Sequence, residues 1–148
     1  MINGLKYGLI NSVIGLIVGV FHLQFNYQNG FLLMYFAPIA IFITGFVFWQ
    51  TTSIKRKING EDAISLGVKV GGLSHVVCFI LINNYLNLEQ LITDFKYSTF
   101  IDLHLNQLTT IPIALFLSLV SLFFYGWFTI GTSIIISIVT IHYLNKKE

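Results

Sequence analysis

The sequence predicts an all-α integral membrane protein, a four-helix bundle in which residues 1–148 form a single transmembrane domain. The first observation behind this prediction is composition: 55% of residues are hydrophobic, only 9% are charged, and the mean hydropathy is +0.80. A soluble domain carries roughly 25% charged residues. The second observation is that residues 7–54, 70–88 and 103–145 contain no Asp, Glu, Lys or Arg. These uncharged stretches are therefore the expected membrane-spanning parts.

Each span follows from the length of these stretches. A helix that crosses roughly 30 Å of hydrocarbon needs about 20 apolar residues. The first stretch is long enough for two spans, and Asn26 to Gly30 favour a turn between them. The expected spans are residues 5–25, 31–50, 63–86 and 110–143.

The last of these spans is longer than one untilted crossing requires, at about 50 Å of helix. It is expected to form one long tilted helix, a helix bent near Gly126, or a hairpin. A single helix is favoured, because a hairpin would leave arms of about 15 residues. Thr109 and Thr110 are the expected N-caps, with Pro112 in the first helical turn.

Basic residues predict the orientation. Lys6, the segment 55–57, Lys69 and the segment 146–147 flank one side, whereas the loop expected at residues 87–107 holds three acidic residues and one lysine. By the positive-inside rule, both termini are expected in the cytoplasm. No cleavage site of small residues follows the first apolar run, so this run is expected to be a retained span.

Small residues at helical spacing predict where helices approach one another. Between membrane helices, small side chains allow close backbone contact. One stripe lies in the first span and a second in the third: Gly4, Gly8, Ser12, Gly15 and Gly19, and Gly67, Gly71 and Ser74. Both stripes are interpreted either as packing inside the bundle or as a surface left over for a second copy or a partner subunit.

Polar residues inside the spans are the candidates for a pore or binding site. His75 lies near the middle of the third span, and the last span carries a polar face of Thr129, Ser133, Ser137 and Thr140. His75 is interpreted as a neutral histidine bonded to a neighbouring group, or as a proton relay or ligand site. Lys69 either reaches the lipid headgroups with its long chain or takes part in transport.

Other classes of function are not expected. The chain shows no hydrolase, metalloprotease or phosphate-binding motif, so no catalytic residues, cofactor or enzyme activity are predicted. Its single cysteine, Cys78, allows no intrachain disulfide. Only His22 and His104 are expected near one another, and no metal site is predicted from them. The short basic segment 55–57 faces lipid headgroups, so no nucleic-acid partner is expected.

Two stretches resemble a family of small bacterial four-span proteins catalogued as a domain of unknown function. They are residues 3–10, Asn-Gly-Leu-Lys-Tyr-Gly-Leu-Ile, and the segment before the third span, Lys-Arg-Lys-Ile-Asn-Gly at 55–60 followed by Ile-Ser-Leu-Gly-Val-Lys-Val-Gly at 64–71. The resemblance covers the whole chain in topology. It implies a bacterial inner-membrane location and carries over no site residue.

Three functions are compatible with these observations. The first is a non-enzymatic inner-membrane protein that works by helix association, as a homo-oligomer or as the membrane subunit of a complex. The second is a small channel, transporter or membrane-permeabilising effector, with His75 and the polar face of the last span along its path. The third is an immunity or exclusion protein that recognises a toxin or phage component through residues 87–107.

Overall fold

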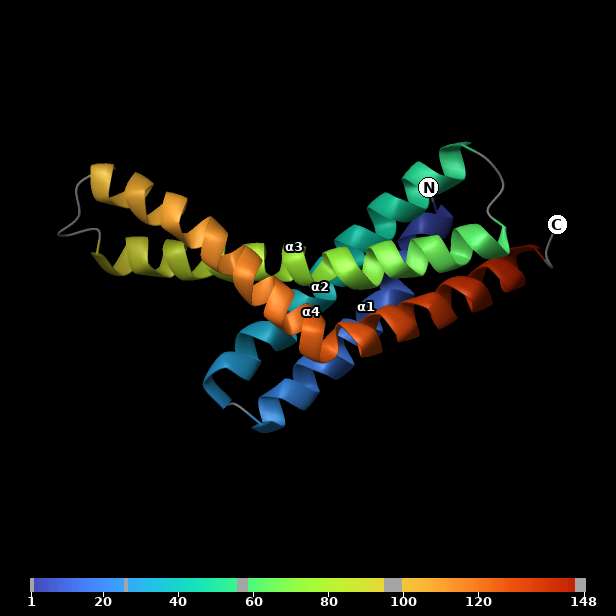
Figure 1. Cartoon of the computed structure of the whole chain (residues 1–148), viewed down its shortest axis with the longest axis horizontal. Coiled ribbons are helices and arrows are strands. Elements are labelled where there is room, and N and C mark those ends of the chain that lie inside the picture. Colours follow the sequence, from blue (N-terminus) through green and yellow to red (C-terminus); the bar gives the residue numbers. More distant parts are fainter. Residues whose placement is uncertain (1, 26, 56–58, 95–99, 146–148) are drawn as a thin grey trace.

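The protein is an all-helical bundle of four membrane-spanning helices (Figure 1). The computed structural model describes residues 2–25, 27–55, 59–94 and 100–145, and in these ranges it contains four helices and no strand. They are α1 (Ile2–Phe25), α2 (Tyr27–Lys55), α3 (Gly60–Asp94) and α4 (Phe100–Asn145). All four are long and apolar enough to cross a membrane, so the predicted fold class is confirmed.

The four helices form two hairpins that cross each other. α1 packs along α2, α3 packs along α4, and the hairpins meet mainly through α2 and α3, with a smaller contact between α1 and α4. Figure 1 shows the start of α1, the end of α2, the start of α3 and the end of α4 at one end of the bundle, called here the termini end. The hairpins diverge towards the opposite end.

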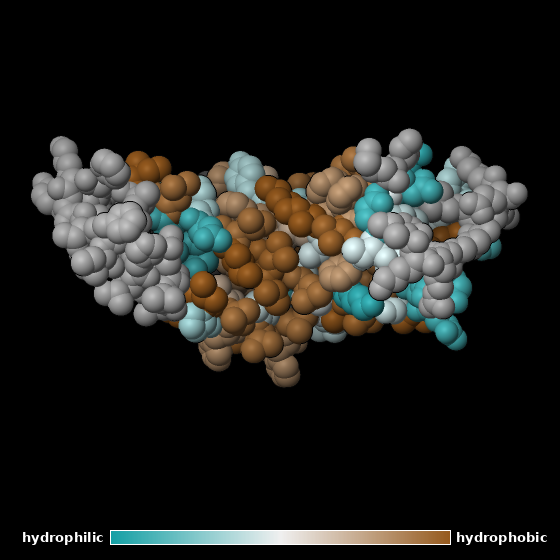
Figure 2. Space-filling view, turned by 90° about the horizontal axis from the view of Figure 1, so that it is seen from above, coloured by the Kyte–Doolittle hydropathy of each residue, from teal (hydrophilic) through white to brown (hydrophobic). Residues whose placement is uncertain are grey.

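The outer surface of the bundle is apolar along its middle. Large hydrophobic side chains point outwards there, and Phe123 and Trp127 are 81% and 74% exposed. Figure 2 shows hydrophobic residues across the centre of the molecule and hydrophilic residues near both ends. A soluble protein does not expose an apolar surface of this extent, whereas a lipid bilayer covers it. The protein is therefore a multi-pass membrane protein.

A buried cluster holds all four helices together at the termini end. It consists of Tyr7, Ile41, Trp49, Ala63, Leu66, Val70 and Ile141. The rings of Tyr7 and Trp49 join α1 to α2 with their centroids 4.8 Å apart. This cluster closes the bundle at the termini end.

The glycines of the two small-residue stripes lie within the hairpins. On α1, Gly8 faces Phe42, Gly15 faces the Ala37–Pro38 peptide, and Gly4 and Gly19 also face α2. On α3, Gly67 and Gly71 face the backbone of α4 at Ile134 and Ile130. The two serines bond to their own helices, Ser12 to the Leu9 carbonyl at 2.7 Å and Ser74 to the Gly71 carbonyl at 3.0 Å. The glycines of both stripes therefore form contacts between helices of the same chain.

The helices extend beyond the predicted spans, and three predictions were wrong. α3 continues to Asp94 and α4 begins at Phe100, so most of the loop expected at residues 87–107 is helical. Thr109 and Thr110 therefore lie inside α4 and are not its N-caps. The turn expected from Asn26 to Gly30 is shorter, because α2 begins at Tyr27. Hydropathy marks where the membrane ends, whereas a helix can continue into water, as α3 does over residues 87–94, which contain no Gly or Pro.

A reciprocal cap begins α3. The Asn59 side-chain oxygen accepts a hydrogen bond from the Asp62 backbone N–H at 2.8 Å, and the Asn59 N–H donates to the Asp62 carboxylate at 3.1 Å. This arrangement satisfies two donors that the first turn leaves open. The acidic side chains Glu61 and Asp62 also suit the positive end of the helix dipole.

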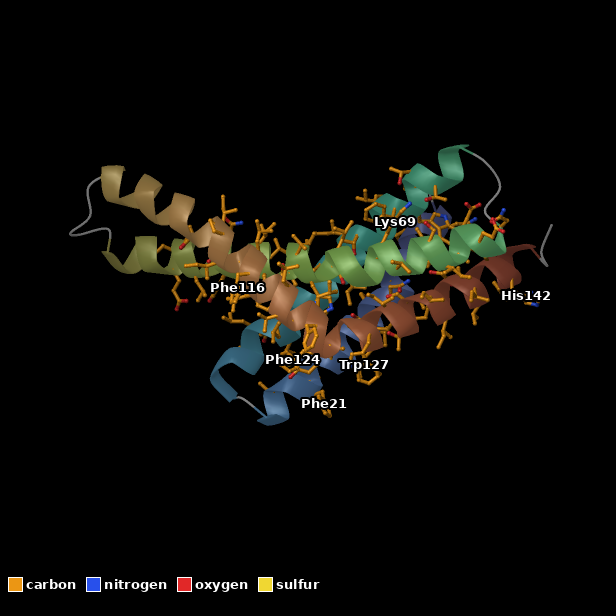
Figure 3. All side chains as sticks on the ribbon, viewed as in Figure 1. Phe21, Lys69, Phe116, Phe124, Trp127 and His142 are labelled. Atoms are coloured by element: carbon orange, nitrogen blue, oxygen red, sulfur yellow. The ribbon has the colours of Figure 1, made fainter. Side chains whose placement is uncertain are left out.

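α4 is one continuous helix with a bend, not a hairpin. The bend lies between Phe124 and Trp127, as the labels of Figure 3 show. Three successive carbonyls accept side-chain hydrogen bonds there: Trp127 Nε1 donates to Phe124 at 2.8 Å, and Thr129 Oγ1 donates to Tyr125 at 3.4 Å and to Gly126 at 3.1 Å. Hydroxyls that bond to carbonyls of the preceding turn bend helices, and Gly126 removes a side chain from the same turn.

The contact between α3 and α4 predicts unequal effects at two neighbouring glycines. A Cβ added at Gly71 would lie 2.6 Å from the Cα of Ile130, whereas one added at Gly72 meets nothing within 4 Å. Gly71→Ala should therefore separate the helices and destabilise the protein by about 1–3 kcal/mol. Gly72→Ala should leave stability unchanged or raise it by about 0.5–1 kcal/mol. Unfolding in mixed detergent micelles measures both, and equal effects would contradict this packing.

Candidate functional site

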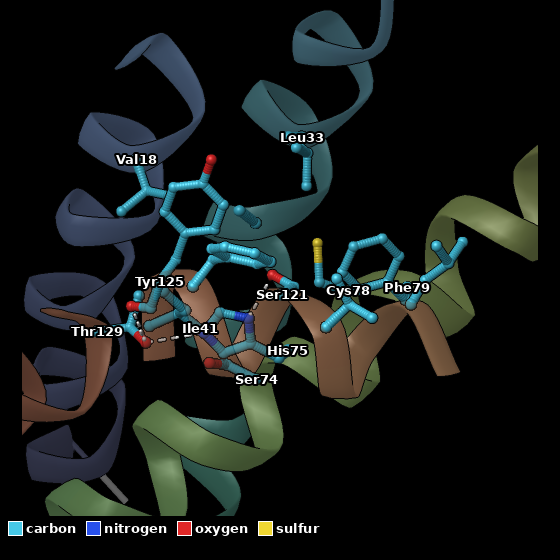
Figure 4. A pocket seen from close by; sticks show the side chains of 14 residues that line it. Val18, Leu33, Ile41, Ser74, His75, Cys78, Phe79, Ser121, Tyr125 and Thr129 are labelled. Atoms are coloured by element: carbon cyan, nitrogen blue, oxygen red, sulfur yellow. Dashed lines mark hydrogen bonds between the residues drawn. The ribbon is translucent and has the colours of Figure 1, made fainter. Parts of the chain in front are cut away.

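A cavity of about 460 Å³ lies between the two hairpins and is lined by all four helices (Figure 4). α1 contributes Val18, and α2 contributes Leu33, Ala37 and Ile41. The other lining residues come from α3 and α4: Ser74, His75, Cys78, Phe79, Leu117, Val120, Ser121, Phe124, Tyr125 and Thr129. The crossing of the hairpins produces this space, since α2 and α4 have no close backbone contact in the described ranges.

The lining of this cavity is apolar except on the side formed by α3 and α4. The polar groups there belong to Ser74, His75, Ser121, Tyr125 and Thr129. None of the 14 lining residues carries a carboxylate, an ammonium or a guanidinium group. The cavity therefore combines an apolar body with one neutral, hydrogen-bonding wall.

His75 joins α3 to α4 through both ring nitrogens. Its Nδ1 lies 2.9 Å from Ser121 Oγ, and its Nε2 lies 2.8 Å from Thr129 Oγ1. The Thr129 hydroxyl donates to the Gly126 carbonyl at 3.1 Å, so its oxygen accepts from Nε2–H. Nδ1 then accepts a hydrogen bond from the Ser121 hydroxyl. This pattern assigns a neutral imidazole with the proton on Nε2, satisfied on both sides.

The bend of α4 brings the two partners of His75 to one ring. Ser121 and Thr129 are eight positions apart, which is roughly 12 Å along a straight helix. One imidazole bonds to both because the helix changes direction between them (Figures 1 and 4). The side-chain bonds of Thr129 thus serve both the bend and the site.

A second cavity of about 290 Å³ continues from the first towards the end opposite the termini. The two cavities share Leu33, Phe79 and Leu117. The second reaches Leu32, Ile82, Asn83, Leu86 and Ala114, in the part of the bundle where the hairpins diverge. These two cavities together lead from His75 towards that end.

On the termini side of His75 lies a row of buried polar residues, Tyr7, Asn11, Ser133 and Ser137. Tyr7 donates its hydroxyl to Ser137 Oγ at 2.5 Å, since Ser137 itself donates to the Ser133 carbonyl at 2.7 Å. Asn11 Nδ2 donates to the Tyr7 carbonyl at 3.0 Å. Asn11 and Ser133 are 0% exposed, yet Asn11 Oδ1 and Ser133 Oγ have no hydrogen-bond partner in the described part of the chain.

The structure brings together some of the predicted polar residues. His75 and Thr129 line the cavity, and Ser133 and Ser137 lie buried beyond it. Thr140 is half-buried and lines neither cavity. Lys69 is exposed on the outside of α3, away from the cavity (Figure 3).

Sequence reasoning missed Ser121, Tyr125 and Tyr7. A signal existed for Ser121, which lies two helical turns before Thr129 on the same polar face. For Tyr7 there was none, because its partner Ser137 is 130 positions away in the sequence.

Comparisons with protein-family models, with curated proteins and with solved structures found no match for this chain. Within the described residues, no three His, Cys, Asp or Glu side chains lie close enough to hold a metal ion. The side chains of His22 and His104 lie outside the described part, so the expectation about them stays a prediction.

Removing the bridge at His75 should destabilise the α3–α4 hairpin. His75→Leu loses two interhelical hydrogen bonds, each worth up to about 1.7 kcal/mol between membrane helices. The free energy of unfolding should therefore fall by about 1–3 kcal/mol. His142, exposed near the end of α4, provides the control, and His142→Leu should change stability by less than about 0.5 kcal/mol. Denaturation followed by circular dichroism measures the difference. Matching effects would show that the His75 bridge contributes little.

Proposed function

We propose that this protein is a small transporter-type protein of the bacterial inner membrane, which takes a neutral, largely apolar molecule with one hydrogen-bonding group into the cavity at His75. The observation that carries the proposal is the cavity of about 460 Å³ with its single polar wall of Ser74, His75, Ser121, Tyr125 and Thr129. Ligand cavities have volumes of about 300–1,000 Å³ and a few convergent polar groups on an apolar lining.

The lining supports the chemistry of this ligand. An ion in the cavity would lose its hydration without meeting an opposite charge, because no lining residue is charged. A neutral molecule places its apolar part against Leu33, Ile41 and Phe79 and its polar group against the wall near His75. The second cavity supports entry from the end opposite the termini.

Helix association has less support than the sequence suggested. Its motivation was the pair of small-residue stripes, and their glycines contact the partner helix of their own hairpin. Immunity through residues 87–107 also has no particular observation in its favour, since the described part of this segment is helical and continues α3 and α4.

The proposed orientation places the termini end in the cytoplasm. Lys6 and Lys69 are exposed towards that end, and the helix ends Lys55 and Asn145 lie there too. A reporter active only in the cytoplasm should work when fused after residue 148 and fail when inserted between residues 95 and 99. A periplasm-active reporter should show the reverse. The same activity at both positions would rule out this topology.

Filling the cavity should abolish ligand binding. Indole serves as a probe, since it is neutral, apolar and carries one N–H group. It should raise the free energy of unfolding by about 2.7 kcal/mol at 100 times its Kd. Val120 lines the cavity, so Val120→Trp should remove this stabilisation.

The matched control for this experiment is the adjacent Leu119, which is 64% exposed on the outer surface. Leu119→Trp adds the same side chain outside the cavity and should keep the indole effect. Thermal unfolding in detergent with increasing indole measures both variants. If wild type shows no stabilisation, or if Leu119→Trp loses it equally, the cavity is not the site.

A further inference from the structure

The polar side chains around His75 already donate their own hydrogen bonds within the protein. His75 donates Nε2–H to Thr129 Oγ1, and the Thr129 hydroxyl donates to a carbonyl of its own helix at 3.1 Å. The Ser121 hydroxyl donates to Nδ1 of His75. The Ser74 hydroxyl donates to a carbonyl of α3 at 3.0 Å. Each of these four side chains therefore has no N–H or O–H group left to offer a ligand.

The other groups that line the cavity add no strong donor beside His75. Backbone N–H groups inside α3 and α4 are bonded along their own helices. Tyr125 belongs to the lining, and Figure 4 shows its hydroxyl pointing away from the His75 ring. The thiol of Cys78 is only a weak donor. Among the 14 described lining residues, the groups that face a ligand beside His75 therefore lack a strong hydrogen-bond donor.

Hydrogen-bond acceptors remain on the same side of the cavity. A hydroxyl oxygen carries two lone pairs besides the proton that it donates. Ser74 and Ser121 each donate one hydrogen bond and line the cavity, so their oxygens can accept a bond from a ligand. The polar wall is therefore a wall of acceptors.

We propose that the cavity at His75 selects molecules that donate a hydrogen bond, namely alcohols, phenols and compounds with an N–H group, over ketones, ethers and esters of the same size. The selectivity rests on the proposed function, because it names the class of molecule that this cavity takes. A donor on the ligand bonds to the oxygen of Ser74 or Ser121. A carbonyl on the ligand meets no donor there, and a polar group left unsatisfied in an apolar site weakens binding.

Thr129 is the positioning residue for this selectivity. Its oxygen accepts Nε2–H of His75, which leaves Nδ1 without a proton and directs the Ser121 hydroxyl to the ring. Without that oxygen, each tautomer of the ring releases one donor. Either Nε2–H loses its partner, or the ring proton lies on Nδ1 and the Ser121 hydroxyl is free to donate to a ligand.

Two ligands of the same shape test the selectivity. Indanol and indanone share one two-ring skeleton, and only indanol has an O–H group. Thermal unfolding in detergent with increasing ligand gives a dissociation constant for each. Indanol should bind wild type about tenfold more tightly than indanone, since one hydrogen bond distinguishes them. A preference below about threefold, or a preference for indanone, would overturn the donor selectivity.

Thr129→Val tests the cause of the selectivity. Valine keeps the shape of the side chain without its oxygen, so the preference for indanol should fall at least about threefold. The control is Thr132→Val, because Thr132 lines neither cavity and its hydroxyl bonds to carbonyls of its own helix. This control should keep the preference of wild type. An unchanged preference in Thr129→Val would overturn the role of Thr129.

The comparison between variants uses a ratio of two affinities. A general loss of stability, or uptake of ligand by detergent, changes both affinities alike and leaves the ratio unchanged. If Thr129→Val does not fold, the ratio in wild type still decides the donor selectivity.

Indole separates this inference from the proposed function. If indole, indanol and indanone all fail to stabilise wild type, the cavity binds no ligand and the proposed function fails. If all three stabilise it and indanol has no advantage over indanone, the ligand site stands and only the donor selectivity fails.

Discussion

The close approach of α3 and α4 at Gly67 and Gly71 is the contact on which the rest of the structure depends. A Cβ at either glycine would lie less than 3 Å from the α4 backbone. Between membrane helices the apolar effect is weak, so association depends on close packing and on hydrogen bonds. His75 lies one turn beyond Gly71, and only at this helix spacing does its ring reach both Ser121 and Thr129.

The bend of α4 also depends on the hydrogen bonds that polar groups must make inside a membrane. Its hydroxyls and the Trp127 indole bond to carbonyls of their own helix, which satisfies polar groups that lipid cannot solvate. The change of direction lets the second half of α4 run along α3 towards the termini end, while the first half crosses α3 at an angle (Figure 1). A straight helix of this length would keep the hairpins parallel or separate them, and the cavity between them would not form in its present shape.

The fold was predictable from the sequence because its signal is local. Stretches without charge locate the helices, and the glycine spacing on α1 and α3 marks their contact faces. The helix ends were harder to predict. Residues 87–94 contain no glycine or proline, so hydrogen bonding continues past the apolar limit, and no hydropathy argument detects this. The Asn59–Asp62 cap was visible as a turn followed by acidic residues.

The site was only half predictable for a related reason. His75 and Thr129 stand out as polar residues on apolar helices, but their bond depends on the register between α3 and α4. The pairing of Tyr7 with Ser137 depends on how the hairpins cross, which no single helix encodes. Crossing also makes the two halves of the bundle unequal. In the described part of the chain, a buried apolar cluster and a row of buried polar residues lie at the termini end, whereas the two cavities extend from His75 towards the other end. The proposed entry of a ligand from the end opposite the termini rests on this difference, because the cavities join His75 to that end and the buried cluster lies on the other side.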